Sequence, residues 1–104
     1  MDQNEVIKTL YQFKNALESI NIRVDKLILF GSYATGFARA DSDIDVIVVS
    51  ASFTNKSYWE RINMLTEAVY RIFAPIEATA MTPEEWKNGT SLIADFARKE
   101  LKVI

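Results

Sequence analysis

Two aspartates separated by one residue are the first feature of this chain that could carry chemistry. Asp43 and Asp45 lead into the β-branched run 46–49, so both side chains are predicted to leave the same face of a strand. At about 6 Å and an effective dielectric constant of about 20, two such charges repel by roughly 3 kcal/mol. Protonation of one acid, an Arg39 partner or a hard divalent cation would relieve this repulsion. On its own, the pair is also typical of two solvated acids at the exposed start of a strand.

The residue inventory excludes several kinds of site. In an EF-hand loop starting at Asp41, the sixth position would be Val46 instead of Gly and the twelfth would be Ser52 instead of Glu. The chain has no His and no Cys, which excludes Ser-His-Asp relays, histidine bases, thiolate zinc sites and disulfides. Any chemistry must therefore use carboxylates, hydroxyls, Lys, Arg and backbone amides.

A Gly-Ser pair follows the short apolar run 27–30. Gly31 would let the backbone approach a ligand closely, and a helical turn after it would direct free N–H groups and the Ser32 hydroxyl at an anion, as in a phosphate site. Neither a Walker loop nor a Gly-x-Gly-x-x-Gly fingerprint is present. The alternative is a glycine that merely ends a strand and a serine that caps a turn.

Together, the two elements resemble the signature of the DNA polymerase β-like nucleotidyltransferase superfamily. In length the chain resembles the minimal nucleotidyltransferases, small prokaryotic members often paired with a helical HEPN-domain partner. The motif residues, all within 27–49, are Gly31, Ser32, Gly36, Arg39, Ser42, Asp43 and Asp45. With the later helix and the segments 76–78 and 82–86, the resemblance extends over most of the chain.

The resemblance implies roles for particular residues. Gly31 and Ser32 would hold the β- and γ-phosphates of a nucleotide. Asp43 and Asp45 would ligate two Mg²⁺ ions, and a third carboxylate from a later strand would complete the site. Glu77 is the best match, and it is also the only acid in the third predicted strand. The alternative for Glu77 is a solvent-facing strand residue.

Other residues near the motif are further candidates. Ser42 and Arg39 would contribute to nucleotide binding, with Arg39 either adding charge at the leaving group or pairing with Asp41. The family often has a basic residue after Gly-Ser, where this chain has Tyr33. Tyr33 and Phe37 either stack on a base or cover a partner surface, or they pack within the loop.

The function that the resemblance implies is Mg²⁺-dependent transfer of a nucleoside monophosphate, AMP from ATP, to a hydroxyl acceptor. Since 104 residues leave no space for an acceptor domain, the acceptor is expected on another chain. By resemblance this would be a HEPN-type toxin, and the present chain its antitoxin. One alternative is a non-catalytic module that keeps the fold and neutralises its partner by contact. Another is a structural subunit whose acids are solvated.

Composition predicts one small domain over residues 1–104. The 12 basic and 14 acidic residues give a net charge of −2, so the basic surface of a stand-alone nucleic-acid binder is missing. No apolar run approaches the roughly 20 residues of a membrane span, and no secretory signal opens the chain. A cytoplasmic location is therefore expected.

Periodicity and capping signals predict the elements. Helices are expected over 3–20, 58–73, a short stretch from Pro83 to Asn88-Gly89, and 91–100. Strands are expected over 27–30, 43–49 and 76–81, with a loop or short helix at 32–41 and a tail or edge strand at 102–104. The helix 58–73 is predicted to bury one stripe: Trp59, Ile62, Leu65, Val69, Ile72 and Phe73.

This order of elements predicts a two-layer α/β (α+β) fold with a small mixed sheet. The link 31–42 is short for a crossover helix, so the strands 27–30 and 43–49 are expected to run antiparallel. A domain of this size has little room for an internal ligand cavity. The site is therefore expected on an open face or edge of the sheet.

Overall fold

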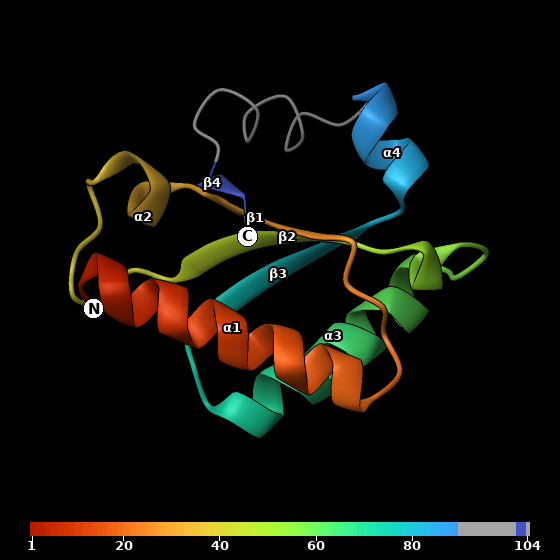
Figure 1. Ribbon diagram of the computed structural model, residues 1–104, viewed down its shortest axis with the longest axis horizontal. Helices are drawn as coiled ribbons and strands as arrows, with labels where there is room; N and C mark the ends of the chain where they lie inside the picture. Colours follow the sequence, from red (N-terminus) through yellow and green to blue (C-terminus); the bar gives the residue numbers. More distant parts are fainter. Residues whose placement is uncertain (90–101, 104) are drawn as a thin grey trace.

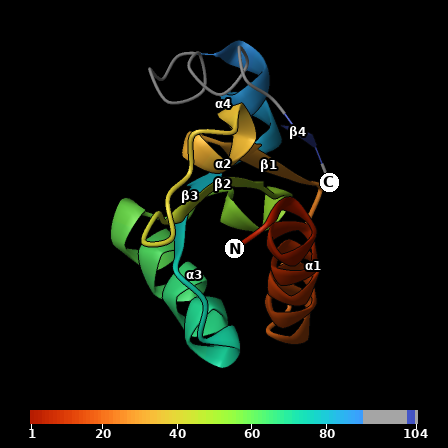
Figure 2. The same ribbon diagram turned by 90° about the vertical axis from the view of Figure 1, so that its left-hand side faces the viewer.

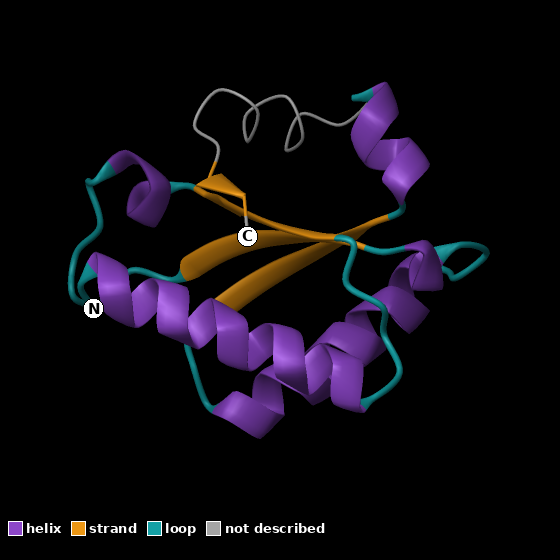
Figure 3. Ribbon diagram, viewed as in Figure 1, coloured by secondary structure: helices purple, strands orange, loops and turns teal. Residues whose placement is uncertain are grey.

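A four-stranded mixed sheet lies between two groups of helices in the computed structural model, which describes residues 1–89 and 102–103 (Figure 1). The strands are β1 (Lys26–Phe30), β2 (Ile44–Val49), β3 (Ile76–Met81) and β4 (Lys102–Val103). The helices are α1 (Gln3–Ser19), α2 (Ser32–Thr35), α3 (Tyr58–Ile72) and α4 (Pro83–Asn88), with a 3-10 turn η1 at Ala51–Phe53. The helices α1 and α3 cover one face of the sheet, and α2 and α4 lie on the other side (Figure 3).

The strand order is β3-β2-β1-β4. The pairs β1–β2 and β1–β4 are antiparallel, whereas β2–β3 is parallel. The predicted mixed sheet, the antiparallel first pair and the edge strand at residues 102–103 are thus confirmed. The inner strand β2 is buried on both faces beyond Asp45, as its β-branched sequence predicts.

Alternate strand residues contribute to two apolar clusters. The larger one packs β-sheet residues such as Leu29 and Val46 against α1 and α3. The smaller one contains Ile28, Ile47, Val49 and Met81, with Phe30 and Trp86 packed against it. Since side chains alternate along a strand, Asp45 shares the face of Ile47 and Val49. The apolar cluster on this face is smaller than the one that packs against α1 and α3.

Helix ends follow the predicted signals. The side chains of Asp2, Ser57 and Thr82 each accept a hydrogen bond from the backbone N–H three residues later. Helix α3 ends at Phe73 in the left-handed conformation, two residues before Pro75, and α4 ends at left-handed Gly89. The helix predicted over 91–100 lies outside the described residues. None of the helices within the described ranges has the length and apolar character needed to cross a membrane.

The predicted buried stripe of α3 is wrong at its two ends. Leu65 is buried, but Trp59 is 70% exposed and Phe73 is 93% exposed. Ala68, which the periodicity did not include, is buried instead. Helix α3 lies beneath β3, and β3 is the outermost strand on that side of the described sheet, so side chains that extend past its edge have no strand above them. The Trp59 ring instead packs edge-to-face against Tyr58, with the ring centroids 5.2 Å apart.

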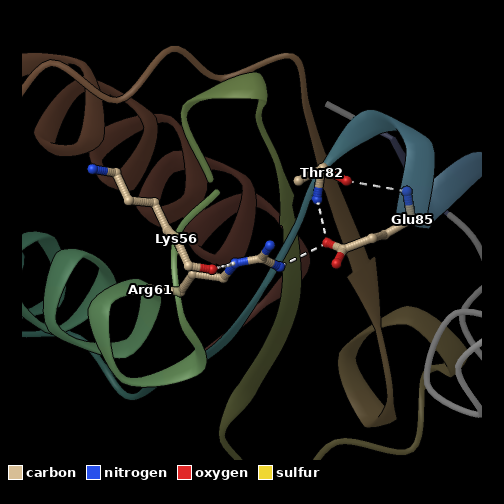
Figure 4. A network of polar contacts seen from close by, with 4 residues as sticks. All are labelled: Lys56, Arg61, Thr82 and Glu85. Atoms are coloured by element: carbon tan, nitrogen blue, oxygen red, sulfur yellow. Dashed lines mark hydrogen bonds and ion pairs between the residues drawn. The ribbon is translucent and has the colours of Figure 1, made fainter. Parts of the chain in front are cut away.

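A polar network joins α3 to α4 (Figure 4). Arg61 donates to the Lys56 carbonyl at 3.1 Å and to Glu85 Oε1 at 2.7 Å. The same Glu85 oxygen accepts from the Thr82 N–H at 2.7 Å, while Thr82 Oγ1 accepts from the Glu85 N–H at 3.1 Å. This capping box fixes the start of α4 at the carboxyl end of β3.

Candidate functional site

Three carboxylates lie where β2 and β3 begin. Asp45 is in register with Glu77 on the parallel neighbour strand, and Asp43 stands directly before β2. Side chains in register on adjacent strands share a face, and residues two apart along a strand do so as well. The fold therefore brings Asp45 and Glu77 to the face opposite α1 and α3, and Asp43 lies close enough for its charge to raise the pKa of Asp45. Figure 2 looks onto this end of the sheet.

Asp45 is the most perturbed acid of the three. Burial raises the pKa of the Asp45 carboxyl, and the charges of Glu77 and Asp43 and a side-chain hydrogen bond with Glu77 raise it further. Asp45 is half-buried, whereas Asp43 and Glu77 are exposed. The repulsion expected from the sequence is therefore present in the fold, and it falls on the acid with the least access to water.

Gly31 touches the Asp45 carboxylate. It follows β1, whose last residue Phe30 is in register with Asp45, and it has φ 73° and ψ −154°. A Cβ at position 31 would collide with Asp45 Oδ2 and lie 3.1 Å from its Cγ. Gly36, at the end of α2, also has a positive φ of 85°, but its Cβ would meet nothing within 4 Å. Only Gly31 is thus required by a close approach of side chain to backbone.

The turn after Gly31 forms the short helix α2. The N–H groups of Ala34 and Thr35 donate to the Gly31 carbonyl at 3.1 and 3.2 Å. The first N–H groups of a helical turn have no partner within it, so those of Ser32 and Tyr33 remain for a ligand or solvent. Backbone donors and the Ser32 hydroxyl therefore lie next to the acidic face, as an anion-binding turn requires.

Two aromatic residues of this loop have different fates. Tyr33 is buried, and its hydroxyl donates to the Arg39 carbonyl at 3.4 Å. Tyr33 thus packs inside the protein, in the larger apolar cluster, which agrees with the packing alternative and not with base stacking or a partner contact. Phe37 is 82% exposed and remains available to a ligand or partner.

Ser42 and Arg39 form the turn that leads into β2. The Arg39 N–H donates to Ser42 Oγ at 2.8 Å, and the Ser42 N–H donates to the Arg39 carbonyl at 3.0 Å. Arg39 is exposed, and within the described residues it forms no ion pair with Asp41. The Ser42 hydroxyl therefore accepts a hydrogen bond within the loop, while the Arg39 guanidinium forms no ion pair with a described carboxylate.

The donor set suits a hard divalent cation. Asp43, Asp45 and Glu77 offer only oxygen ligands, and their mutual repulsion is the kind that a cation relieves. Within residues 1–89 and 102–103, however, no three acidic side chains converge tightly enough to form a ready metal cluster. Asp43 and Glu77 are exposed, and exposed side chains change rotamer within nanoseconds. The residues fit the ion chemically, and closing the ligand set requires rotation of these two side chains.

A groove beside Glu77 was missed by the sequence reasoning. It encloses about 500 Å³ between α3 and β3, and its lining includes Val69, Tyr70, Phe73, Glu77 and Ala78. Two features of the sequence could have indicated this groove. Ala78 and Ala80 are small side chains at alternate positions of β3, and the neighbouring helix α3 has more aromatic residues than one buried face can hold.

Comparisons with known proteins place the chain. Residues 10–102 match the profile of the nucleotidyltransferase domain. Two proteins of Methanocaldococcus jannaschii, both named putative protein adenylyltransferase, are 49% identical over 43 residues and 39% identical over 46 residues. These stretches cover 40% and 43% of this chain, and the chain spans less than half of each relative, 43% and 46%.

Two solved structures share the fold. The crystal structure of a putative nucleotidyltransferase from Sulfolobus solfataricus aligns with a TM-score of 0.68 at 20% identity. The alignment covers 83% of this chain and 75% of the Sulfolobus chain. A toxin-antitoxin structure with AMP-PNP has a TM-score of 0.60 at 19% identity, covering 99% of this chain and 72% of its own. The family profile spans most of the sequence, and this chain therefore belongs to the nucleotidyltransferase domain family.

Proposed function

We propose that this chain transfers AMP from ATP to a hydroxyl group of a partner protein, with Mg²⁺ bound by Asp43, Asp45 and Glu77. The observation that carries the proposal is the Asp45 carboxylate, which lies against the Gly31 backbone and in register with Glu77. This arrangement joins an acidic cation site to a turn with free backbone donors. A nucleoside triphosphate with its divalent cation needs both.

The residues of the turn would bind the triphosphate. The N–H groups that begin α2 and the Ser32 hydroxyl would donate to the β- and γ-phosphates. Arg39 would add positive charge near the pyrophosphate as it leaves, since no ion pair with Asp41 holds its guanidinium. Ser42 would act by holding the Arg39 turn through the hydrogen bond from the Arg39 N–H.

The reaction exchanges a phosphoanhydride bond of ATP for a phosphoester bond to the acceptor. The acceptor hydroxyl oxygen forms a bond to the α-phosphorus, while the bond from that phosphorus to pyrophosphate breaks and its electron pair leaves with pyrophosphate. Glu77 would accept the hydroxyl proton, since it is an exposed acid on β3, the outermost strand on that side of the described sheet. Bound divalent cations would supply the positive charge that offsets the carboxylates and the triphosphate.

The comparisons support the nucleotide and the partner. The names of the Methanocaldococcus jannaschii relatives support adenylyl transfer to protein, and the structure with AMP-PNP supports ATP and a toxin-antitoxin setting. The acceptor would be a HEPN-domain toxin bound in a hetero-oligomer, and residues 1–104 would act as one minimal nucleotidyltransferase domain. The cytoplasm, which supplies ATP and Mg²⁺, would be its location.

Transfer of label tests this function. The protein is incubated with MgCl₂, ATP labelled at its α-phosphate, and the product of the neighbouring gene. Label on that product is expected with the wild type and with the distant control Glu85→Gln, but not with Asp45→Asn. A stable complex that never acquires label would contradict transferase activity and support the alternative, a non-catalytic module that neutralises its partner by contact.

A further inference from the structure

The outer edge of β3 offers free backbone groups. In the described part of the sheet, β3 pairs only with β2. The Ile44 N–H donates to the Pro75 carbonyl at 2.8 Å, and the Ser50 N–H donates to the Met81 carbonyl at 2.9 Å. In a parallel ladder these two bonds direct the odd-numbered residues of β3 toward β2. The N–H and C=O groups of Ala78 and Ala80 therefore point away from the sheet.

An apolar groove runs along this edge. Its helix wall includes Ile62, Val69 and Tyr70, and its strand wall includes Ile76 and Ala78. Figure 2 shows α3 beneath β3 at that side of the sheet. The alanine at position 78 leaves the groove open, because a larger side chain on this face would fill the space between strand and helix.

Two features distinguish this edge from one that is merely exposed. Natural edge strands are commonly shortened or blocked by Lys or Pro, yet β3 has six residues and contains neither. Phe73, at the end of the groove, is 93% exposed in a left-handed conformation with φ 51°. Bulky residues rarely adopt this conformation, and strain of this kind is concentrated at functional sites.

The alternation of side chains links the groove to the acidic face. In a strand added to β3, the side chain opposite Ala78 would enter the apolar groove, and the neighbouring one opposite Glu77 would lie on the acidic face. We propose that the edge of β3 docks an extended segment of the acceptor protein by strand addition, with a Ser, Thr or Tyr hydroxyl opposite Glu77.

The chemistry of the groove defines the segment. Its walls are mostly apolar, and Glu77 is the only acid among the described residues that line it. The segment would therefore carry an apolar anchor one residue away from the hydroxyl that is modified, and it would bind through main-chain hydrogen bonds to Ala78 and Ala80. This inference rests on the proposed transferase function, since it assigns Glu77 to the reacting hydroxyl.

A peptide library tests the docking mode. The probe is a pool of ten-residue peptides with valine at alternate positions and one central tyrosine, serine or threonine. Peptides that acquire label from α-labelled ATP and MgCl₂ are resynthesised with N-methyl groups on either set of alternate amides. We expect at least a tenfold loss of labelling when the amides that face β3 are methylated, and less than a twofold change for the other set.

Two variants of the full chain provide the matched protein arm. Ala78→Pro removes one outward N–H without removing a bond to β2, whereas Ala78→Ser keeps that N–H. We expect at least a tenfold loss of peptide labelling for Ala78→Pro and none for Ala78→Ser. Both should keep the increase in melting temperature that is expected of the wild type with ATP and MgCl₂. The methylated peptides keep the test decisive if Ala78→Pro fails to fold.

The outcomes separate the two proposals. If ATP and MgCl₂ do not raise the melting temperature of the wild type, the proposed function itself is wrong. A retained shift with no labelled peptide, or with equal labelling by Ala78→Pro, would overturn strand addition alone. Sedimentation of the wild type as a dimer that Ala78→Pro dissociates would also overturn it, because a second copy would then occupy the edge.

Discussion

The two ends of the sheet treat carboxylates in opposite ways. Where β2 and β3 begin, Asp45 has acids as neighbours, and burial together with Glu77 and Asp43 raises its pKa. Where β3 ends, burial raises the pKa of Glu85, but hydrogen bonds from Arg61 and Thr82 outweigh it and lower the pKa overall. The Glu85 carboxylate has hydrogen-bond donors and a cation as neighbours, which stabilise its charge. The Asp45 carboxylate has two other acids as neighbours, which destabilise its charge. Acids left in this state point to a ligand that supplies the missing charge.

The largest expected effect is that of Asp45→Asn on transfer. Removing one carboxylate from the proposed cation site should lower the rate about a thousandfold, equivalent to roughly 4 kcal/mol of transition-state stabilisation. Steady-state labelling of the acceptor measures this loss. A rate within threefold of the wild type would show that Asp45 is not part of the reacting site.

The same variant should gain stability. The pKa of Asp45 is raised in the folded chain above its ordinary value of 3.8, so the carboxyl favours folding only while it is protonated. Its contribution is fully present below 3.8 and is lost as the pH rises through the folded-state pKa. Asp45→Asn should therefore melt higher than the wild type at pH 7 and not at pH 3. Equal melting curves at pH 7 would contradict the strain assigned to this acid.

Gly31→Ala should cause the largest loss of stability. The new Cβ would collide with the Asp45 carboxylate, and alanine would have to adopt a positive φ that is strained for it. Together these effects should cost about 3 kcal/mol. Gly36→Ala is the matched control, because its φ is also positive but its Cβ has open space, and about 1 kcal/mol is expected. Urea denaturation measures both. Equal losses would mean that the contact between Gly31 and Asp45 carries no energy.

Glu85→Gln tests the other end of the sheet. Because the pKa of Glu85 is lowered in the folded chain, the Glu85 carboxylate stabilises the fold at pH values above its ordinary pKa of 4.5. This stabilisation is lost as the pH falls through the folded-state pKa. The variant should lose about 0.5 kcal/mol at pH 7, as expected for an exposed ion pair, and the loss should shrink as the pH falls below 4.5. This pH dependence is opposite in sign to that of Asp45, so parallel titrations of both variants would sharpen the contrast.

Phe73→Gly should have the smallest effect on folding. Glycine enters the left-handed conformation without strain, so the end of α3 should gain about 0.5 kcal/mol. The exposed ring at the end of the groove would be lost at the same time, and labelling of the peptide probe should fall. A gain of stability with unchanged peptide labelling would remove Phe73 from the docking surface.

The fold was largely predictable because its signals are local. The caps at Asp2, Ser57 and Thr82, the β-branched run of β2 and the stop at Gly89 are all confirmed. The buried face of α3 was not predictable in full, because its periodicity does not say where the sheet ends. Trp59 and Phe73 are apolar residues at helical spacing, yet the strand above them is an edge.

The assignment of Asp43, Asp45 and Glu77 to a site stays a prediction, and their placement was predictable only in part. The Asp-x-Asp spacing and the position of Glu77 predicted three acids on one face, and the parallel register of β2 and β3 sets Glu77 beside Asp45. The contact between Gly31 and Asp45 could not be read from the sequence, since it depends on the antiparallel register of β1 and β2. The groove along β3 depends likewise on which strand lies at the edge.

The most direct test of the acidic site is the melting temperature with MgCl₂ and a non-hydrolysable ATP analogue. A ligand at ten times its dissociation constant adds about 1.4 kcal/mol, a shift of several degrees for a domain of this size. We expect this increase in melting temperature for the wild type and for Glu85→Gln, and no increase for Asp45→Asn. An equal shift in Asp45→Asn, or none in the wild type, would contradict it.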